Sequence, residues 1–404
     1  MQRPGLTRYN AGNMTMGTGM RSYLVTLALG ALAFGMAACQ KPGTVRETKG
    51  DEPDGAVTIL FAGDFSYGEN YGPGLKLVKK RGYDFSLRKL APMLRDADFV
   101  IANLETPVTD LKESPYADSK AYCHWTDVVH TPRAMNKYGI RTVSLANNHT
   151  LDFGLPGLMQ TFDVLGKAGI TVFGAGKTEK EARAPFVKDF PVGGQTFTLA
   201  VFGAFEYSRS YDKKYSFYAK GDKPGASRLS AKGTGRVIRQ FKKENPNAFA
   251  VAYPHWGGNY SWATKKQKKL APELLTAGAD LIVGHGARQY QQFEKHDGRW
   301  IVYNLGNFMF NSPGRYKMLK APNYSMTAKL IVYEKGGKLR ADMKLYPILC
   351  NNRVTKYNPR PLTDEEFEEA LGLQIQKSGD PAAFAKYVRR GKDNIGPFLK
   401  IQIM

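Results

Sequence analysis

The sequence predicts an α/β fold, because short apolar runs alternate with helical patterns from residue 56 onward. The apolar runs that fit buried strands are 56–63, 98–104, 141–147, 171–176, 197–204, 248–254, 280–285 and 300–306. The segments 132–139 and 264–278 have helix signals, with a proline or a threonine near the start and a glycine just past the end. A glycine-turned hairpin over 329–348 is expected to complete the sheets with antiparallel strands.

Composition and motifs exclude several other classes of protein. The chain of 404 residues has 22 Phe, 22 Tyr and 4 Trp, which is ample material for a folded core. Three Cys are too few for a disulfide scaffold or a thiolate zinc module. The sequence has neither the GxSxG elbow of an α/β-hydrolase nor the P-loop of an NTPase. GAGK at 174–177 lacks the rest of a dinucleotide fingerprint, so we interpret it as a turn.

The N-terminal segment has the pattern of an export signal. Residues 1–38 contain a basic start and an apolar stretch over 24–38 that is too short for a comfortable transmembrane helix. Residues 36–39 resemble the cleavage motif of bacterial lipoproteins, which predicts lipidation of Cys39; cleavage by an ordinary signal peptidase is the alternative. Residues 39–55 are polar and rich in Gly and Pro, so we expect a flexible tether. The prediction is an exported lipoprotein, on a periplasm-facing membrane or the cell surface.

The remaining chain is predicted to form one main domain over 56–348 and a helical extension over 349–404. In the extension, Thr363 begins a capping box, and Asp380 followed by proline begins a second helix. If the chain is exported, Cys123 and Cys350 are in an oxidising compartment, where they either pair or stay free.

The net charge of +22 indicates an affinity for polyanions. Residues 1–38 contribute three arginines and no acid, so the rest of the chain carries 22 − 3 = +19. Nucleic acid, anionic lipid and an acidic envelope polymer are all polyanions that this charge would attract. The alternative is that the basic surface only keeps the protein soluble and binds no partner. The segment 205–220 alternates aromatic and basic residues, including Arg209. We expect it to be an insertion that binds an acidic polymer or a glycan at the mouth of the site, or else a solvated loop.

Polar side chains with metal-binding chemistry follow the apolar strands at the points where the strands end. They are Asp64, Asn103, Glu105, Asn147, Asn148, His149, Asp152, His255, His285, Asn304 and Asn307. Open α/β sheets place ligand sites at the carboxyl ends of their strands, so we expect these residues to converge. Carboxylates, an amide and imidazoles together favour Zn, Mn or Fe over an all-oxygen calcium site. Without a Cys ligand, a structural zinc site is not expected.

The same residues lie in motifs that resemble the CapA family of poly-γ-glutamate capsule biosynthesis proteins, which are relatives of the calcineurin-like metallophosphoesterases. The motifs are GDF at 63–65, NLETPVT at 103–109, SLANNHTLDFG at 144–154, PHWGGNY at 254–260, GHGARQYQ at 284–291 and VYNLGNFMF at 302–310. The resemblance covers residues 57–347. It implies a four-layer αββα sandwich of the metallophosphoesterase type, followed by the small helical extension.

The resemblance also implies roles for individual residues. Asp64 would bind a first metal, Glu105 would bridge, and Asn148, His255 and His285 would hold a second metal. His149, oriented by Asp152, would protonate a leaving oxygen or stabilise developing charge. The residues expected to contact substrate are Asn103, Asn147, Asn259, Asn307 and Arg209.

Two positions depart from the family's usual pattern, and a third departs from that of the two-metal phosphoesterases, whose His the family also generally lacks. Ser66 stands where two-metal phosphoesterases have a His, Asn259 where the family often has a glutamate, and Arg288 where most relatives have a second His. A guanidinium has no acceptor atom and cannot ligate a cation, so we expect one tightly bound divalent ion (Mn, Zn or Fe). Arg288 would instead hold an anionic substrate oxygen with two parallel hydrogen bonds.

Three functions remain open at this point. The first is an envelope-anchored, metal-dependent hydrolase for a phosphoester or a γ-glutamyl polymer, working with membrane proteins of capsule synthesis or export. The second is a general periplasmic metallophosphoesterase, and the third is a non-catalytic binding component of an export complex. In all three the expected partner is an acidic polymer or a phosphorylated substrate, and nucleic acid is not expected.

Overall fold

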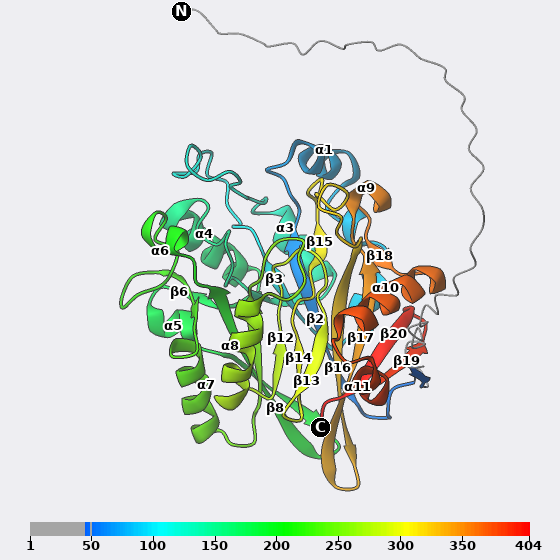
Figure 1. Cartoon of the computed structure of the whole chain (residues 1–404). Helices are drawn as coiled ribbons and strands as arrows, with labels where there is room; N and C mark the ends of the chain where they lie inside the picture. The colour runs from blue at the N-terminus through cyan, green and yellow to red at the C-terminus, as the bar shows by residue number, and fades with distance from the viewer. Residues whose placement is uncertain (1–44, 49–50) are drawn as a thin grey trace, which may run out of the picture. The chain divides into compact units, whose positions relative to one another are not determined.

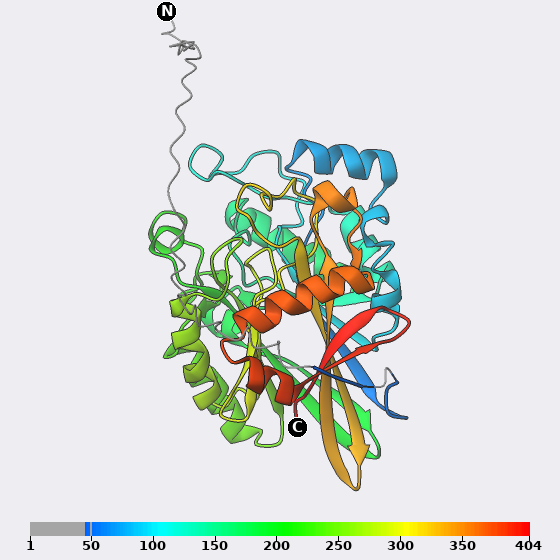
Figure 2. The same ribbon diagram turned by 45° about the vertical axis from the view of Figure 1, so that its right-hand side comes forward.

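The computed structural model describes residues 45–48 and 51–404, and Figures 1 and 2 show it in two views. The predicted signal peptide (1–38) and Cys39 lie outside the described residues. Part of the predicted tether belongs to the fold, because β1 (Arg46–Glu47) pairs in parallel with strand β19 (Val388–Lys392). Glu52 also forms ion pairs with the buried Lys329 and Lys344. Ordered structure therefore begins before residue 56, because backbone pairing and buried charges hold this segment against the sheet.

The larger sheet has 11 strands and combines a parallel half with an antiparallel half. In the parallel half, β2 (Val57–Ser66), β3 (Phe99–Leu104), β4 (Ile140–Ser144) and β5 (Thr171–Phe173) lie in order, and β15 (Asn307–Phe310) also pairs with β2. The antiparallel half contains the predicted hairpin, β16 (Tyr324–Lys335) and β17 (Lys338–Leu349), with β18, β19 and β20 beyond it.

Helices from the first half of the chain cover one face of the larger sheet. They are α1 (Gly72–Arg81), α2 (Ala91–Arg95), α3 (His130–Lys137) and α4 (Gly154–Lys167), with a 3₁₀ turn at Phe85–Leu87. Their apolar residues, such as Val78 and Leu158, pack in one cluster with Leu60 and Val100 of the strands.

The second sheet has seven strands in the order β10, β8, β11, β12, β14, β13, with β7 paired to β8. Their bounds are β7 (Phe186–Val192), β8 (Gln195–Glu206), β10 (Arg228–Leu229), β11 (Phe249–His255), β12 (Leu281–Val283), β13 (Phe293–His296) and β14 (Arg299–Val302). Helices α7 (Gly233–Glu244) and α8 (Lys265–Thr276) cover its outer face. Thr264, predicted as the N-cap, is the N-cap of α8 and also forms a capping box with Gln267. Helices α5 (Glu179–Arg183) and α6 (Arg209–Lys213) and the strand pair β6 (Ala175–Gly176) and β9 (Gly225–Ala226) complete this region.

The two sheets share a core, which makes the fold an α/β sandwich. Ile59 and Phe61 of β2 lie in one apolar cluster with Leu199 of β8 and Val251 of β11, whereas Leu60 points into the helix-covered cluster. This alternation follows from the two-residue period of a strand. The prediction of an α/β fold is therefore confirmed. Among the described residues, no helix is both long and apolar enough to cross a membrane.

We expect a helical C-terminal segment from the sequence, but the structure has strands there as well as helices. The segment contains α9 (Asn352–Thr355), α10 (Asp364–Lys377) and α11 (Pro381–Tyr387), with the predicted capping box and N-cap, but also β18 (Arg360–Pro361), β19 (Val388–Lys392) and β20 (Pro397–Gln402). Strand β20 pairs with β17, so this segment widens the larger sheet by backbone hydrogen bonds. All three strands are short, and β18 and β19 have no apolar run; β20 does have apolar residues, and its Phe398, Leu399 and Ile401 are buried, but the expectation of a helical extension overlooked them.

Candidate metal site and anion-binding cavity

The strands bring the predicted site residues to one edge of the sandwich. Asp64 lies near the end of β2, Asn103 near the end of β3, and His255 at the end of β11. Strands β2, β3 and β4 run parallel to one another in one sheet, as do β8, β11 and β12 in the other, so their carboxyl ends meet. An isolated backbone bridge joins His255 to His285, just beyond β12.

Asp64, His255 and His285 form a buried group with the spacing of metal ligands. The Nδ1 atoms of the two histidines are 3.1 Å apart, and Asp64 Oδ1 lies 3.2 Å from His285 Nδ1 and 3.7 Å from His255 Nδ1. An ion with four ligands at about 2.0–2.2 Å in a tetrahedron separates its ligand atoms by about 3.3–3.6 Å. The three donor atoms therefore fit one divalent ion of the Zn, Mn or Fe type.

The charge states of these side chains suit a cation. Burial would raise the pKa of Asp64, but the hydrogen bond with His285 and nearby positive charge outweigh it and hold this pKa below its ordinary value. Burial lowers the pKa of His255 to about 3, so its imidazole is neutral and has a lone pair available for a metal.

Two further predicted ligands have buried oxygen atoms without a partner. Glu105 Oε2 and Asn148 Oδ1 accept no hydrogen bond from the described residues, and the same holds for the other ring nitrogen of His285, Nε2. A buried polar atom without a partner is costly, so such atoms mark places where a ligand or water belongs. The donor chemistry and the two orphaned oxygen atoms fit a bound cation, whereas Nε2 of His285, on the other side of the ring from Nδ1, marks a place for a hydrogen-bond acceptor or water.

Asn103 and Asn147 have a positioning role in the structure. Asn103 donates to Asp64 Oδ1 at 2.9 Å and accepts from Asn147 at 3.0 Å, and Asn147 also accepts from the backbone N–H of His149 at 3.0 Å. Both side chains are fully buried, and their contact with substrate stays a prediction. Gly286 completes the frame, because its N–H donates to Asp64 and an added Cβ would lie 3.0 Å from the His255 ring.

Arg288 lies beside Glu105 instead of turning to solvent. Its guanidinium donates to Glu105 Oε1 at 3.2 Å and lies over the Phe310 ring at 4.4 Å. Arg288 has a φ of +64°, a left-handed conformation that is uncommon for a residue with a Cβ. Burial raises the pKa of Glu105 well above its ordinary range, although Arg288 opposes this rise.

His149 belongs to a second buried group, with Asp152 and two residues that the sequence analysis missed, Lys120 and His124. His149 Nδ1 lies 2.5 Å from Asp152 Oδ2, and Lys120 Nζ lies 2.5 Å from Asp152 Oδ1. The His124 ring stacks on that of His149 with 3.4 Å between centroids, and its backbone N–H donates to Asp152 at 2.6 Å. Burial and the charge of Lys120 lower the pKa of His149 well below its ordinary value, and burial raises that of Asp152 to about 6.

A cavity of about 390 Å³ opens beside these groups. Its lining contains three cations, Lys120, Arg288 and Arg315, and no carboxylate. Among the other predicted residues, Asn148, His149 and Asn259 line it, whereas Arg209 of α6 and Asn307 do not. Asn307 donates to the hydroxyl of Tyr316 at 3.2 Å. From the insertion 205–220 it is Tyr211 that reaches the cavity.

Residues 58–312 match the family model described as "Bacterial capsule synthesis protein PGA_cap". The chain belongs to this family, which confirms the resemblance inferred from the motifs. It is 28% identical over 330 residues to the capsule biosynthesis protein CapA of Bacillus anthracis, covering 81% of this chain and 74% of the relative. It is 28% identical over 259 residues to the PGA biosynthesis protein CapA of Bacillus subtilis, covering 64% of each chain.

Proposed function

We propose that this chain is a metal-dependent hydrolase that acts on an acidic polymer of the bacterial envelope during capsule or poly-γ-glutamate synthesis. Family membership supports the process. The observation that carries the chemistry is a buried group of three metal ligands next to a cavity with three cations and no carboxylate in its lining. Such a lining attracts carboxylate or phosphate groups. The two sheets with helices on their outer faces support a four-layer arrangement of the metallophosphoesterase type.

In this proposal Asp64, His255 and His285 hold one divalent ion, with Asn148 and Glu105 as further oxygen donors. When bound, the ion supplies Lewis acidity, which polarises a substrate oxygen and favours attack by water. Arg288 binds an anionic oxygen of the substrate, because its guanidinium lines the cavity and stays protonated.

His149 moves the proton in this scheme. Because Nδ1 lies 2.5 Å from an Asp152 oxygen, we assign its proton to Nδ1, which leaves the lone pair on Nε2. Lys120 holds Asp152 in its ionised form. The positive charges that lower the pKa of His149 are offset when an anionic substrate enters, so Nε2 gains the ability to take a proton and return it to the leaving group.

A second candidate function is a non-catalytic polymer-binding component of an export complex. One observation favours it: Arg288 already pairs with Glu105, the carboxylate that would bridge two ions in a binuclear enzyme. Turnover separates the two candidates, since a binding component binds polymer but does not cleave it.

The test uses the purified full chain loaded with Mn, Zn or Fe(II). Cleavage of oligo-γ-glutamate and of an aryl phosphate is measured for the wild type, for His285→Ala and for His296→Ala, a control at a histidine on β13 outside the site. We expect hydrolysis of at least one substrate that is lost in His285→Ala and kept in the control. If the metal-loaded wild type turns over neither substrate, the hydrolase proposal is excluded and the binding component is the remaining candidate. Cleavage of the aryl phosphate alone would indicate a general phosphoesterase.

We further propose that the protein is exported and anchored in the envelope through lipidated Cys39, where it works with membrane proteins of capsule synthesis or export. The support is the apolar segment that ends in small residues before Cys39. Replacing Cys39 with Ser should move the protein from the membrane fraction to the soluble fraction. Unchanged membrane association would show that another feature anchors the chain.

A further inference from the structure

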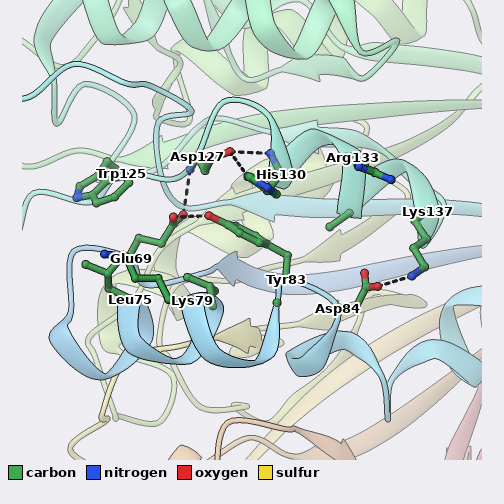
Figure 3. Close-up of a pocket in the computed structure, with 13 residues that line it drawn as sticks. Glu69, Leu75, Lys79, Tyr83, Asp84, Trp125, Asp127, His130, Arg133 and Lys137 are labelled. Carbon is green, nitrogen blue, oxygen red and sulfur yellow. Dashed lines mark hydrogen bonds and ion pairs between the residues drawn. The ribbon is translucent and has the colours of Figure 1, made fainter.

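A second and larger cavity, of about 600 Å³, lies between α1 and α3 (Figure 3). This volume falls within the range of ligand-binding pockets. Lys79 of α1 and Arg133 of α3 come from its opposite walls, and part of its lining is apolar: Leu75, Val78 and Ala134. No residue of this cavity belongs to the ligand group described above.

The carboxylates of this cavity are already engaged. Glu69 accepts from the hydroxyl of Tyr83 at 2.5 Å, from that of Thr126 at 2.5 Å, and from the backbone N–H of Asp127 at 3.0 Å. Asp127 accepts from the backbone N–H groups of Val129 and His130 and lies 2.9 Å from the His130 ring nitrogen Nδ1. Figure 3 shows the contacts of Glu69 with Tyr83 and Asp127 and of Asp127 with His130, together with the ion pair of Asp84 and Lys137.

Two cations remain after this pairing. Within residues 51–404, neither the Lys79 ammonium nor the Arg133 guanidinium has a hydrogen bond or an ion pair, and both side chains are exposed. Three more basic residues of α1 (Lys76, Lys80 and Arg81) are exposed nearby, and the helix contains no acid. The lining balances three carboxylates against three cations, so the surplus of positive charge comes from Lys76, Lys80 and Arg81 beside it, while Lys79 and Arg133 remain without a direct partner among the described residues.

Aromatic rings add a flat apolar surface between these charges. The His130 ring stacks on the Tyr83 ring with an angle of 10° and 5.1 Å between centroids, and Trp125 also lines the cavity. Aliphatic carbons pack well against such rings and against the apolar lining. A ligand with both methylene groups and carboxylates matches this surface better than a polyphosphate, which has no apolar part.

The two cavities are neighbours along the chain. Glu69 lines the larger cavity, and Tyr71 lines the cation-lined cavity, the one with Lys120, Arg288 and Arg315. The Cα atoms of Glu69 and Tyr71 are two trans peptide steps apart, which span at most about 7.6 Å. Tyr122 lines the cation-lined cavity and Trp125, three residues later, lines the larger one, with Cys123 and His124 between them. The Tyr71 hydroxyl lies 3.1 Å from His124 Nε2, which joins the two segments into a common wall. One extended chain could therefore occupy both cavities.

From these observations we infer that the cavity between α1 and α3 is a second binding subsite for an acidic chain, which holds carboxylates of the polymer on Lys79 and Arg133. The inference rests on the proposed function for the identity of the polymer, but it requires binding only, not hydrolysis. A chain with a carboxylate on every repeat would place one repeat in the cation-lined cavity and others along this subsite.

The experiment measures binding of fluorescent oligo-γ-glutamate to the full chain in chelator, where no hydrolysis takes place. We expect Lys79→Ala combined with Arg133→Ala to weaken binding about tenfold or more, because charge-assisted hydrogen bonds of this kind are lost. The control is Lys335→Ala combined with Lys338→Ala, which removes the same charge from the β16–β17 turn and should change affinity less than twofold. Lys79→Glu with Arg133→Glu serves as a second variant with a larger expected loss.

Equal affinity in the wild type and both subsite variants would overturn the inference, and so would an equal loss in the control pair. Polyphosphate of matched charge is the second probe. If its binding falls as much as that of oligo-γ-glutamate, the cavity is a general anion site and selectivity for a carboxylate chain is refuted. The binding assay does not depend on turnover. A negative result in the hydrolysis test therefore refutes only the proposed hydrolase, and a negative result in the binding assay refutes only the second subsite.

Discussion

The ion pair of Arg288 and Glu105 can be tested by replacing Arg288 with Met. Glu105 is 1% exposed and Arg288 9% exposed, and their closest atoms are 3.2 Å apart. With an effective dielectric constant of about 20, unit charges at this distance attract by about 5 kcal/mol. Removing one partner leaves a buried carboxylate without compensation, for which losses of about 3–5 kcal/mol are typical. Because burial already raises the pKa of Glu105, its carboxyl takes up a proton more readily once Arg288 is gone; we therefore expect Arg288→Met to lower the free energy of unfolding by at most about 3–5 kcal/mol, with the larger loss at high pH.

The choice of Met isolates the charge from other effects. Arg288 has a φ of +64°, and Met carries the same Cβ, so backbone strain at this position does not change. Met also retains an apolar contact with the Phe310 ring, over which the guanidinium lies.

The assay is a double-mutant cycle followed by urea unfolding in chelator, with tryptophan fluorescence and circular dichroism as coincident probes. Glu105→Gln combined with Arg288→Met should recover most of the loss, giving a coupling energy of about 2–4 kcal/mol, because neither charge then remains. Two results would refute the interpretation of Arg288 as the counter-ion of Glu105. One is a loss in the free energy of unfolding below about 1 kcal/mol in Arg288→Met, and the other is a double variant that is as unstable as this single variant.

Three further predictions address the metal, the proton transfer and the thiols. His285→Ala should lose the tightly bound ion while keeping its circular dichroism spectrum, because one of three buried ligands is removed; elemental analysis that finds wild-type metal content would contradict this. His149→Ala should keep the ion and lose about 10²–10⁴-fold in turnover if His149 moves the proton, and steady-state kinetics with unchanged rates would exclude that role. Cys350 and Cys123 are free thiols, and burial raises the pKa of Cys350 to about 11. About 0.1% of Cys350 is then thiolate at pH 8, so iodoacetamide should label it slowly in the native protein and quickly in urea. Mass spectrometry measures this labelling, and a Cys123–Cys350 disulfide in the native protein would contradict the structure.

The sequence predicted the parallel strands and the residues at their ends because both have a local signal. An apolar run that stops at a carboxylate, an amide or an imidazole marks a carboxyl end, and parallel strands bring such ends together. Asp64, His255 and His285 meet for this reason. The predicted strands over 141–147 and 300–306 are shorter in the structure and end at Ser144 and Val302, because the polar residues that follow hydrogen-bond in loops.

Lys120 and His124 could not be found in this way, because they lie in the long connection between β3 and α3, which has no apolar period. Their place in the site depends on how this loop folds over Asp152, and only tertiary contacts determine that. Strand β19 escaped for a related reason, because it is basic and is stabilised by pairing with β20. Strand β20 pairs with β17 and also packs Phe398, Leu399 and Ile401 into the core, so its apolar residues were a signal that the prediction did not use.

The arrangement of charges in the site explains why we expect one ion and not two. The second buried group, His124, His149 and Asp152, has ligand atoms close enough together for a metal, but Lys120 Nζ already lies 2.5 Å from Asp152. Both ring nitrogens of His124 also have partners, the Glu105 carbonyl at 3.0 Å and the Tyr71 hydroxyl at 3.1 Å. Since Arg288 pairs with Glu105, a second cation would have to displace an ammonium or a guanidinium from a buried carboxylate. In the proposed function, Lys120 and Arg288 would therefore provide the positive charge that a second metal would bring to an anionic substrate.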